Sequence, residues 1–455
     1  MLLEQSFTSG LGHASYLVAD PEAGVAFLVD PERDPEPYLA AAARLGVLIT
    51  HSFETHVHND YLSGSAALAR IRPITVVTGA KFEVEHPHTA LADGHEIVVG
   101  NLAVRALATP GHTPEHVSYL VADLTRSSEP QYLFSGGALL VGHIARVDLF
   151  GPRLEERFAR EAFATLHDRI LPLEDHLAVF PTHGGGSACS TGTSSSRWTT
   201  LGFERRYNAV IAAALRDFET FHAEVTHALP AAPAYYPHLR ALNARGAALP
   251  PHGPLAFVGE EALRKKDAVL VDPRPPHVFA TGYRKGALND VGNDGFAVRL
   301  GATVEFGARI VLLTDDPEQA ERLRDQLSVI GYDDVLGYAL PLAADDAPAV
   351  SPQVEPREAG SVEDAVLLDV RELAEVEQGI AAGAVHVPYG RLTARMLELP
   401  KDKPILAYCA SGVRSSLAAS LLRAAGYDAR NVRGGMAAWR GAGLPVTRPK
   451  EATPV

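Results

Sequence analysis

The chain has 455 residues, and its content of 46% hydrophobic and 21% charged residues is typical of a globular protein. Its formal net charge of −14, with no basic block to offset it, argues against binding of nucleic acid. A chain of this length is too long for one hydrophobic core, so we expect about two to four domains. It shows no signal peptide, no apolar run long enough to span a membrane, and only two cysteines, Cys189 and Cys409. We therefore expect a cytoplasmic protein that does not bind membranes.

The first half of the chain interleaves predicted strands and helices. Residues 15–30 predict a hairpin around a turn at 20–24, residues 35–45 have helical spacing, and the apolar residues 47–50 predict a buried strand. The later predicted strands are 97–99, 102–108, 132–134 and 177–180, and the later predicted helices are 153–170 and a segment that ends near 225. This order predicts a layered sandwich of two sheets with helices outside.

Possible metal ligands follow three of these strands. His56, His58 and Asp60 occupy alternate residues in E-T-H-V-H-N-D-Y, and alternate side chains of an extended backbone share a face. His112 follows in T-P-G-H-T-P-E-H, and His183 follows in P-T-H-G. Because neutral imidazole suits zinc and iron, three histidine-bearing loops that each follow a strand predict a metal centre.

From about residue 250 the sequence contains an internal repeat of roughly a hundred residues. The first copy has predicted strands at 268–271 and 309–313 and a helix at 317–330. After a linker at 341–360, the second copy has strands at 365–369 and 405–408 and a helix at 413–425. Each copy is therefore predicted to be an α/β unit with a parallel sheet, and Asp369 and Arg371 are expected to form a structural pair.

The second copy carries C-A-S-G-V-R-S, from Cys409 to Ser415, between its strand and its helix. Such a loop directs successive backbone N–H groups at one atom beside a helix N-terminus, which favours an anion and activates a thiol. Cys409 is therefore the predicted sulfur nucleophile, and Arg414 is expected either to tie the loop or to contribute charge. The remaining residues predicted to surround the substrate are Ala410, Ser411, Gly412, Val413 and Ser415.

These motifs resemble those of known families. The C-x-x-G-x-R segment resembles the active-site loop of rhodanese sulfurtransferases, and the histidine loops resemble those of the metallo-β-lactamase superfamily. Their order resembles the fused persulfide dioxygenase–rhodanese family. This resemblance implies an αββα metallo-β-lactamase-type sandwich with a helical extension at 1–250, a degenerate rhodanese domain without cysteine at 251–345, and an active rhodanese domain at 356–450.

The resemblance also implies a function. A low-molecular-weight thiol persulfide would be oxidised to sulfite at a mononuclear metal, most readily Fe(2+) with Zn as the alternative. The rhodanese would carry sulfur as a persulfide of Cys409 between thiol persulfide, thiosulfate and sulfite. The expected partners are these small molecules, and the formation of a homo-oligomer stays open.

Two residues depart from the metallo-β-lactamase pattern. Tyr61 stands where the superfamily has a histidine ligand of a second metal, and Gly137 stands where it has a bridging aspartate. The iron ligands that the family implies correspond to His56, His112 and Gly137, so only two of them remain.

Several outcomes are open for the missing ligand. His58 could join His56 and His112, or Asp60 together with His183 could supply a carboxylate. Alternatively the metal is weakly bound, and the first domain is a persulfide-binding module beside a sulfurtransferase. A thioester hydrolase of the glyoxalase II kind is a further alternative, although it relies on a pair of metal ions.

Overall fold

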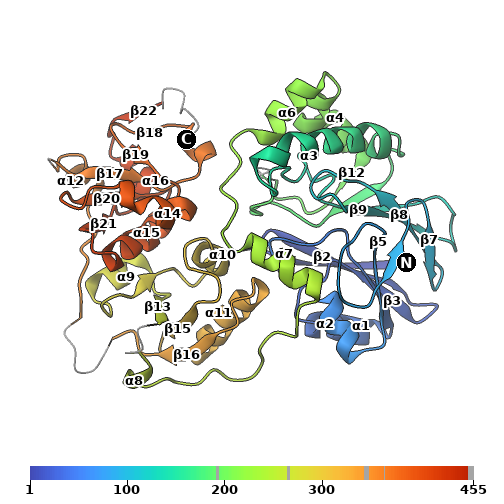
Figure 1. The fold of residues 1–455 in the computed structure, drawn as a ribbon, viewed down its shortest axis with the longest axis horizontal. Coiled ribbons are helices and arrows are strands. Elements are labelled where there is room, and N and C mark those ends of the chain that lie inside the picture. The colour runs from blue at the N-terminus through green and yellow to red at the C-terminus, as the bar shows by residue number, and fades with distance from the viewer. Residues whose placement is uncertain (191–193, 264–266, 343–347, 363, 449–455) are drawn as a thin grey trace. The chain divides into compact units, whose positions relative to one another are not determined.

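The structure of the protein, a computed structural model, describes residues 1–190, 194–263, 267–342, 348–362 and 364–448. The chain divides into two compact units (Figure 1). The first comprises Met1–Ala232 and Tyr236–Pro250, and the second comprises Pro233–Tyr235 and Pro251–Val455. In the described ranges, helices that combine the length and the apolar character needed to cross a membrane are absent.

The described part of the first unit contains two six-stranded sheets. The strands of one sheet, in spatial order, are β1 (Leu2–Thr8), β2 (His13–Asp20), β3 (Val25–Val29), β4 (Leu48–Phe53), β5 (Thr75–Gly79) and β6 (Thr89–Leu91). The strands β1, β2 and β3 are antiparallel, whereas β3 to β6 are parallel. The hairpin predicted at 15–30 is thereby confirmed as β2 and β3. The helices α1 (Glu36–Leu45) and α2 (Ser65–Ile71) connect the parallel strands.

The second sheet of this unit follows in the chain. Its strands, in spatial order, are β12 (Thr199–Thr200), β11 (Ala178–Pro181), β10 (Tyr132–Gly136), β9 (Val117–Asp123), β8 (Leu102–Ala108) and β7 (Glu96–Val99). One buried apolar cluster joins both sheets, and it includes Phe27 and Phe53 from the first and Tyr119 and Phe134 from the second. Burial of these large rings from water is what holds the two sheets face to face.

Helices cover the outer faces of this sandwich. Tyr38 of α1 and Leu68 of α2 pack on the first sheet, and Phe158 of α3 (Pro152–Thr165) packs on the second. The short π-helix η1 (Leu166–Ile170) continues α3. Together with the structural comparisons below, this arrangement confirms the predicted αββα sandwich.

The helical extension differs from the continuous segment that the sequence predicts. It consists of α4 (Leu201–Tyr207), α5 (Ala209–Ala214), α6 (Phe218–Thr226) and α7 (Tyr236–Arg245). The breaks have a local cause, because the side chains of Asn208 and Asp217 accept hydrogen bonds from the first turns of α5 and α6 and so begin new helices.

The described residues of the second unit form two parallel four-stranded sheets with the same strand order, which agrees with the predicted repeat. One has the order β14 (Leu288–Asn289), β13 (Ala268–Asp272), β15 (Arg309–Leu313) and β16 (Val335–Ala339), and the other has the order β19 (Val385–His386), β17 (Val366–Asp369), β20 (Ile405–Tyr408) and β21 (Ala429–Asn431). A small antiparallel pair, β18 (Ile380–Ala381) and β22 (Val446–Thr447), belongs to the second copy, where β18 contacts β17.

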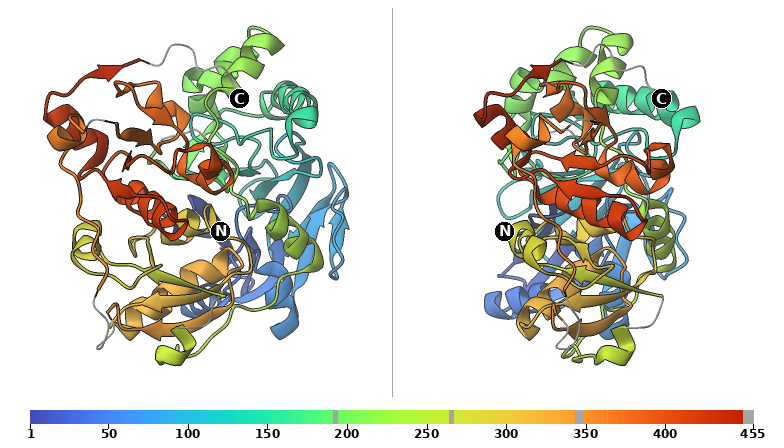
Figure 2. Two further views of the ribbon diagram at one scale, coloured as in Figure 1. Left: turned by 60° about the vertical axis from the view of Figure 1, so that its left-hand side comes forward. Right: turned by 90° about the vertical axis from the view of Figure 1, so that its left-hand side faces the viewer.

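Helices flank both of these sheets (Figures 1 and 2). Those of the first copy are α8 (Glu260–Leu263), α9 (Pro276–Thr281), α10 (Phe296–Gly301) and α11 (Pro317–Val329). Those of the second copy are α12 (Pro356–Ala359), α13 (Leu373–Val376), η2 (Tyr389–Arg391), α14 (Leu392–Arg395), η3 (Met396–Glu398), α15 (Val413–Ala424) and α16 (Gly435–Gly441). The helix α15 contacts β20 and β21 of its own sheet.

An Asp-x-Arg pair repeats in the two copies with matching geometry. Arg274 donates to Asp272 at 2.6 Å and to the Gly282 carbonyl at 2.8 Å. Arg371 makes the same two contacts, with Asp369 at 2.6 Å and with the carbonyl of Gly379 at 2.8 Å. The structural role predicted for Asp369 and Arg371 is therefore confirmed. The domain limits at 345 and 356 stay predictions, and residues 343–347, 363 and 449–450 of the predicted linker and domains lie outside the described residues.

Candidate metal centre and sulfur-transfer site

The structure brings together His56, His112 and His183, which come from the loops after β4, β8 and β11. One ring nitrogen of each histidine lies within 4.8 Å of those of the other two, and all three side chains are buried. The Nε2 atoms of His56 and His183 are 3.3 Å apart. The Nε2 atom of His112 has no hydrogen-bond partner within the described part of the chain. The group spans both sheets of the sandwich, since β4 belongs to one sheet and β8 and β11 to the other.

The other ring nitrogen, Nδ1, of each histidine contacts an outer partner. These partners are Thr55 Oγ1 at 2.9 Å for His56, the Arg146 carbonyl at 2.7 Å for His112 and Asp60 Oδ2 at 3.2 Å for His183. A carbonyl and a carboxylate can only accept a proton. The single hydroxyl proton of Thr55 is donated to Asp30 at 2.7 Å, so this oxygen also accepts from His56. His56 and His112 therefore carry their proton on Nδ1, which leaves the Nε2 lone pair of each ring free for the group.

These nitrogens fit a bound cation. Burial, helped by the neighbouring imidazoles, holds the pKa of His56 and of His112 well below the ordinary histidine value, so both rings are neutral ligands. The Nε2 atoms of His56 and His183 lie 3.3 Å apart, a spacing at which one cation can contact both nitrogens. An outer partner on Nδ1 is also the usual arrangement around metal-binding histidines. The residues present are therefore compatible with a divalent metal that accepts nitrogen ligands, such as iron or zinc.

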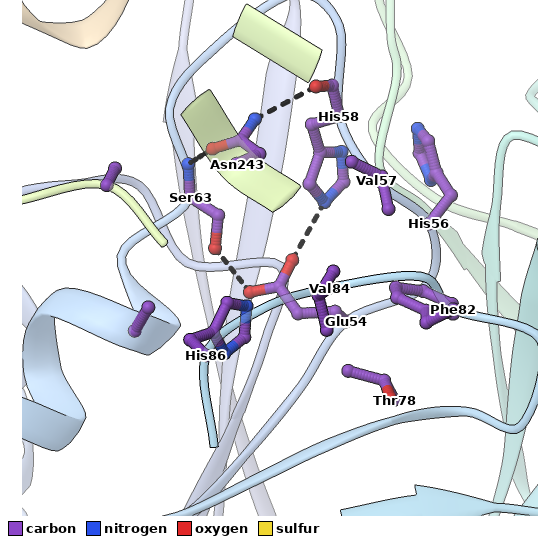
Figure 3. A pocket seen from close by; sticks show the side chains of 12 residues that line it. Glu54, His56, Val57, His58, Ser63, Thr78, Phe82, Val84, His86 and Asn243 are labelled. Atoms are coloured by element: carbon purple, nitrogen blue, oxygen red, sulfur yellow. Dashed lines mark hydrogen bonds and ion pairs between the residues drawn. The ribbon is translucent and has the colours of Figure 1, made fainter. Parts of the chain in front are cut away.

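His58 lies in a different group. Its Nε2 atom is 3.2 Å from Asp30 Oδ1 and 3.1 Å from Glu54 Oε2, and the contact with Glu54 appears as a dashed line in Figure 3. Burial opposes charge on this ring, but the two carboxylates prevail and raise its pKa to about 10. The sequence-based alternative in which His58 completes the group with His56 and His112 is therefore not what the structure shows, because His183 takes that place. The His58 ring turns away from the other histidines because it contacts the buried carboxylate of Asp30, which lies 28 residues upstream.

Asp60 occupies the outer side of His183. It contacts Nδ1 of that ring, on the opposite side from the Nε2 atom that faces His56. Burial raises the pKa of Asp60, but the neighbouring imidazoles, first of all His183, lower it further than burial raises it. Asp60 therefore orients His183 rather than joining the three Nε2 atoms, although it also lies close to Cys189.

Gly137 leaves no room for a side chain. A Cβ atom at this position would lie 2.6 Å from Cδ2 of His112 and 2.9 Å from Cβ of Ala145. Its N–H donates to Nε2 of His116 at 2.8 Å, and Nδ1 of His116 contacts Thr109 Oγ1 at 2.8 Å. His116 is thus occupied in stabilising its loop, and the His112 ring fills the space beside Gly137.

Two cavities are lined in part by residues of the segment 80–84. A cavity of about 680 Å³ is lined by Lys81, Pro114, Arg157 and Arg240, among others. Arg240 donates two hydrogen bonds of 3.0 Å to Glu115, in the loop that carries His112. The smaller pocket of Figure 3 is lined by Glu54, His56, His58 and His86, among others. Solute-sized space therefore adjoins the histidine loops.

The loop after β20 holds Cys409 at the start of α15. Cys409 is 1% exposed, and its Sγ atom accepts a hydrogen bond from the N–H of Gly412 at 3.1 Å and lies 3.5 Å from the Ser415 hydroxyl oxygen. Asn431 braces this loop, because it donates to the Gly412 carbonyl at 3.0 Å and accepts from Ser415 at 2.7 Å. Of the other predicted loop residues, Ala410 and Ser411 precede the N-cap Gly412, and Val413 begins the helix. The arrangement suits an anionic sulfur at Cys409.

Arg414 forms an ion pair rather than lying free. Its two terminal nitrogens donate to Glu375 at 2.6 and 2.7 Å. The sequence leaves two roles open for Arg414, either to tie the loop or to contribute charge. The structure shows the first, because Arg414 ties the cysteine loop to α13.

Comparison with known proteins agrees with this division of the chain. Residues 355–442 match the Rhodanese-like domain family. The chain is 42% identical over 89 residues to a sulfurtransferase of Allochromatium vinosum, which covers 19% of this chain and 83% of that protein. It is 28% identical over 189 residues to human mitochondrial persulfide dioxygenase ETHE1, which covers 40% of this chain and 68% of that protein. The chain belongs to the fused persulfide dioxygenase–rhodanese family.

A solved structure supports the same assignment. The crystal structure of a metallo-β-lactamase from Staphylococcus aureus has a TM-score of 0.69 and 28% identity, and the match covers 75% of this chain and 99% of that chain. The predicted fold class is thereby confirmed. The prediction of an enzyme that acts as a persulfide dioxygenase or a sulfurtransferase is confirmed by the two relatives and by the family match.

In this fused dioxygenase–rhodanese, a further buried histidine, His13, begins β2 of the first unit. Its ring lies 3.8 Å from that of Tyr61 between centroids, and neither of its nitrogens has a hydrogen-bond partner among the described residues. Burial lowers its pKa to about 3, so the ring is neutral. Tyr61 donates to the Asp30 carbonyl at 3.2 Å and fills the space beside His58. No local pattern marks His13, because it stands alone in an apolar strand.

Cys189 lies in an environment that favours the thiol. It is buried, and its Sγ atom is 3.6 Å from the Tyr236 hydroxyl. Burial raises its pKa far above the ordinary cysteine value. Because the thiolate is the reactive form, this environment favours an inert side chain.

Proposed function

We propose that the first unit is a persulfide dioxygenase whose metal, iron(II), is held by His56, His112 and His183. The observation that carries the proposal is the convergence of three buried imidazoles, each with one ring nitrogen within 4.8 Å of those of the other two. Iron held by three imidazoles keeps coordination positions at which O2 and a persulfide sulfur can react. The substrate would be a low-molecular-weight thiol persulfide, and the products would be the thiol and sulfite.

The protein's own residues would hold the thiol part of this substrate. The cavity of about 680 Å³ is lined by the cations Lys81, Arg157 and Arg240 and by acidic side chains that include Glu115. A lining of mixed charge suits a zwitterionic thiol such as glutathione, whose ammonium and carboxylates would both find partners. Arg240 also fixes the loop that carries His112 through its two hydrogen bonds to Glu115.

We propose that the second unit contains an inactive rhodanese domain at 251–345 and an active one at 356–450. The Cys409 thiolate would attack the outer sulfur of a donor R–S–S–H. The bond between the donor sulfurs breaks, its electron pair leaves with the thiol, and Cys409 becomes a persulfide. Sulfite would then attack the outer sulfur to give thiosulfate and restore the Cys409 thiolate. The Gly412 N–H and the start of α15 would stabilise the negative sulfur in both states.

The test begins with anaerobic purification, metal analysis and an oxygen electrode. We expect about one iron per chain and O2 uptake that depends on glutathione persulfide. His112→Ala is expected to abolish O2 uptake and to leave sulfur transfer from thiosulfate intact, whereas Cys409→Ser is expected to do the reverse. Iron-loaded protein that takes up no O2 with persulfide but cleaves a glutathione thioester would reject the dioxygenase in favour of a hydrolase.

A further inference from the structure

We propose that Glu375 sets the donor preference of the rhodanese site: by neutralising Arg414 it disfavours thiosulfate and directs Cys409 toward thiol persulfides. The inference rests on the proposed role of Cys409 as the sulfur carrier. It goes further by assigning the class of donor to a residue outside the cysteine loop.

The ion pair between Arg414 and Glu375 is two-pronged and stands at the solvent boundary. The two hydrogen bonds of 2.6 and 2.7 Å use both terminal nitrogens of the guanidinium and both carboxylate oxygens. The side chains are 21% and 31% exposed, so a dissolved anion that approaches the guanidinium also meets the negative charge of Glu375. Arg414 is also close enough to Cys409 for a negative charge on the sulfur to raise the pKa of Arg414.

Glu375 is held in place by its own helix. Its carboxylate accepts the N–H of Glu372 at 3.0 Å, as part of the capping box that begins α13. Its carbonyl accepts a hydrogen bond from Arg371 at 3.1 Å. Burial raises the pKa of Glu375, but the hydrogen bonds and charge of Arg414 lower it below the ordinary value, so the carboxylate is ionised at neutral pH. Both members of the pair are therefore charged at neutral pH.

Arg371, another cation near this helix, is neutralised in the same way. It donates to Asp369 at 2.6 Å and is nearly buried. Neither Arg371 nor Arg414 therefore presents an uncompensated positive charge to a donor that approaches Cys409.

This charge balance acts differently on the two classes of donor. In both reactions the Cys409 thiolate attacks the outer sulfur, the sulfur–sulfur bond breaks, and the electron pair leaves with the departing group, so no further oxidant or reductant is needed. Thiosulfate is a dianion whose departing group is sulfite, and its binding depends on a free cation near the sulfur. A thiol persulfide has at most one negative charge at its sulfur end. The other charged groups of the thiol, such as the carboxylates of glutathione, lie far from the sulfur atoms that react.

The test is Glu375→Gln in the full chain, assayed anaerobically with thiosulfate or glutathione persulfide as donor and cyanide as acceptor. Glutamine keeps the shape of the side chain and an oxygen for the cap, but it releases Arg414. We expect kcat/KM with thiosulfate to rise about ten-fold, mostly through KM, and kcat/KM with glutathione persulfide to change less than about two-fold.

The matched control is Glu398→Gln. It removes the same charge from a similar ion pair of the second copy, in which Arg395 donates to Glu398 at 2.7 Å. This variant is expected to leave the ratio of the two donors unchanged. A ratio that Glu375→Gln also leaves unchanged, or that shifts away from thiosulfate, overturns the inference while the proposed function stands. Sulfur transfer that survives Cys409→Ser rejects the proposed function instead.

The wild-type protein offers an independent measurement should the variant not fold. Because Arg371 and Arg414 are both paired with carboxylates, kcat/KM for thiosulfate is expected to vary less than about two-fold between about 20 and 200 mM potassium chloride. A steep fall with salt indicates attraction of the dianion by an unpaired cation and contradicts the inference.

Discussion

The Nε2 atoms of His56 and His183 lie 3.3 Å apart, although 127 residues separate them in the chain. His56 follows β4 of the first sheet, whereas His183 follows β11 of the second. His112 approaches from the loop after β8. The candidate metal centre therefore depends on the packing of both sheets, and a bound metal would tie them together.

The first prediction separates His183 from His58 as a metal ligand. His183→Ala removes one of the three converging lone pairs, so bound iron is expected to fall from about one per chain to near zero. His58→Gln is expected to keep its iron, because the His58 ring faces Asp30 and Glu54. Metal analysis of both variants after anaerobic purification checks this prediction.

The two variants differ in stability as well. His58→Gln leaves two buried carboxylates without a cation, which costs about 3–5 kcal/mol, whereas the loss of His183 costs less in the metal-free protein. His95→Ala, at an exposed turn, is the control. Iron that disappears with His58→Gln and persists with His183→Ala would show that the ligand set is wrong.

The second prediction concerns Asp60, the outer partner of His183. Asp60→Asn keeps the size of the side chain but weakens its hold on Nδ1 of His183, which lies 3.2 Å away. We expect the affinity for iron to fall about 10–100-fold, with full occupancy recovered at higher iron concentration. A titration with iron(II) under anaerobic conditions measures this. If occupancy is lost at every concentration, Asp60 is itself a ligand.

The third prediction uses the tight contact at Gly137. Gly137→Ala places a methyl group 2.6 Å from Cδ2 of His112, so the ring must move away from the other two histidines. We expect a loss of iron and of O2 uptake with sulfur transfer unchanged. Gly441→Ala, where a Cβ atom meets nothing within 4 Å, is the control. Retention of iron by Gly137→Ala would mean that His112 is not held against this glycine.

The fourth prediction concerns the pH dependence of the Arg414–Glu375 pair. The pKa of Glu375 is lower in the folded protein than its ordinary value of 4.5. Its contribution to the stability is therefore complete above pH 4.5 and is lost as the pH falls from there through the lowered pKa. Because the pair is partly exposed, the contribution amounts to less than about 1 kcal/mol. The difference in melting temperature between the wild type and Glu375→Gln should shrink over this range, and a difference that grows toward acid pH contradicts the assignment.

Much of the fold follows from local patterns. Alternating and apolar runs predict β2, β3, β8, β11, β15 and β20, and the repeat of strand, loop and helix predicts the parallel sheets of the second unit. The helical extension is less well predicted, because the breaks at Asn208 and Asp217 depend on side-chain caps. Apolar spacing alone does not show that a capping side chain ends one helix and begins the next.

The sequence by itself determines the parts of both sites that lie within one loop. His56, His112 and His183 are recognisable because each closely follows a strand, and Cys409 because its whole loop is contiguous. Only the tertiary structure decides which carboxylate contacts each histidine and Arg414. Asp30 contacts His58, which therefore lies outside the histidine group, and Asp60 contacts the outer nitrogen of His183, which lies within it. Glu375 pairs with Arg414, although it lies 39 residues upstream. These contacts depend on charged groups that are distant in the sequence and close in space, and Coulomb energies follow distance in space rather than separation in sequence.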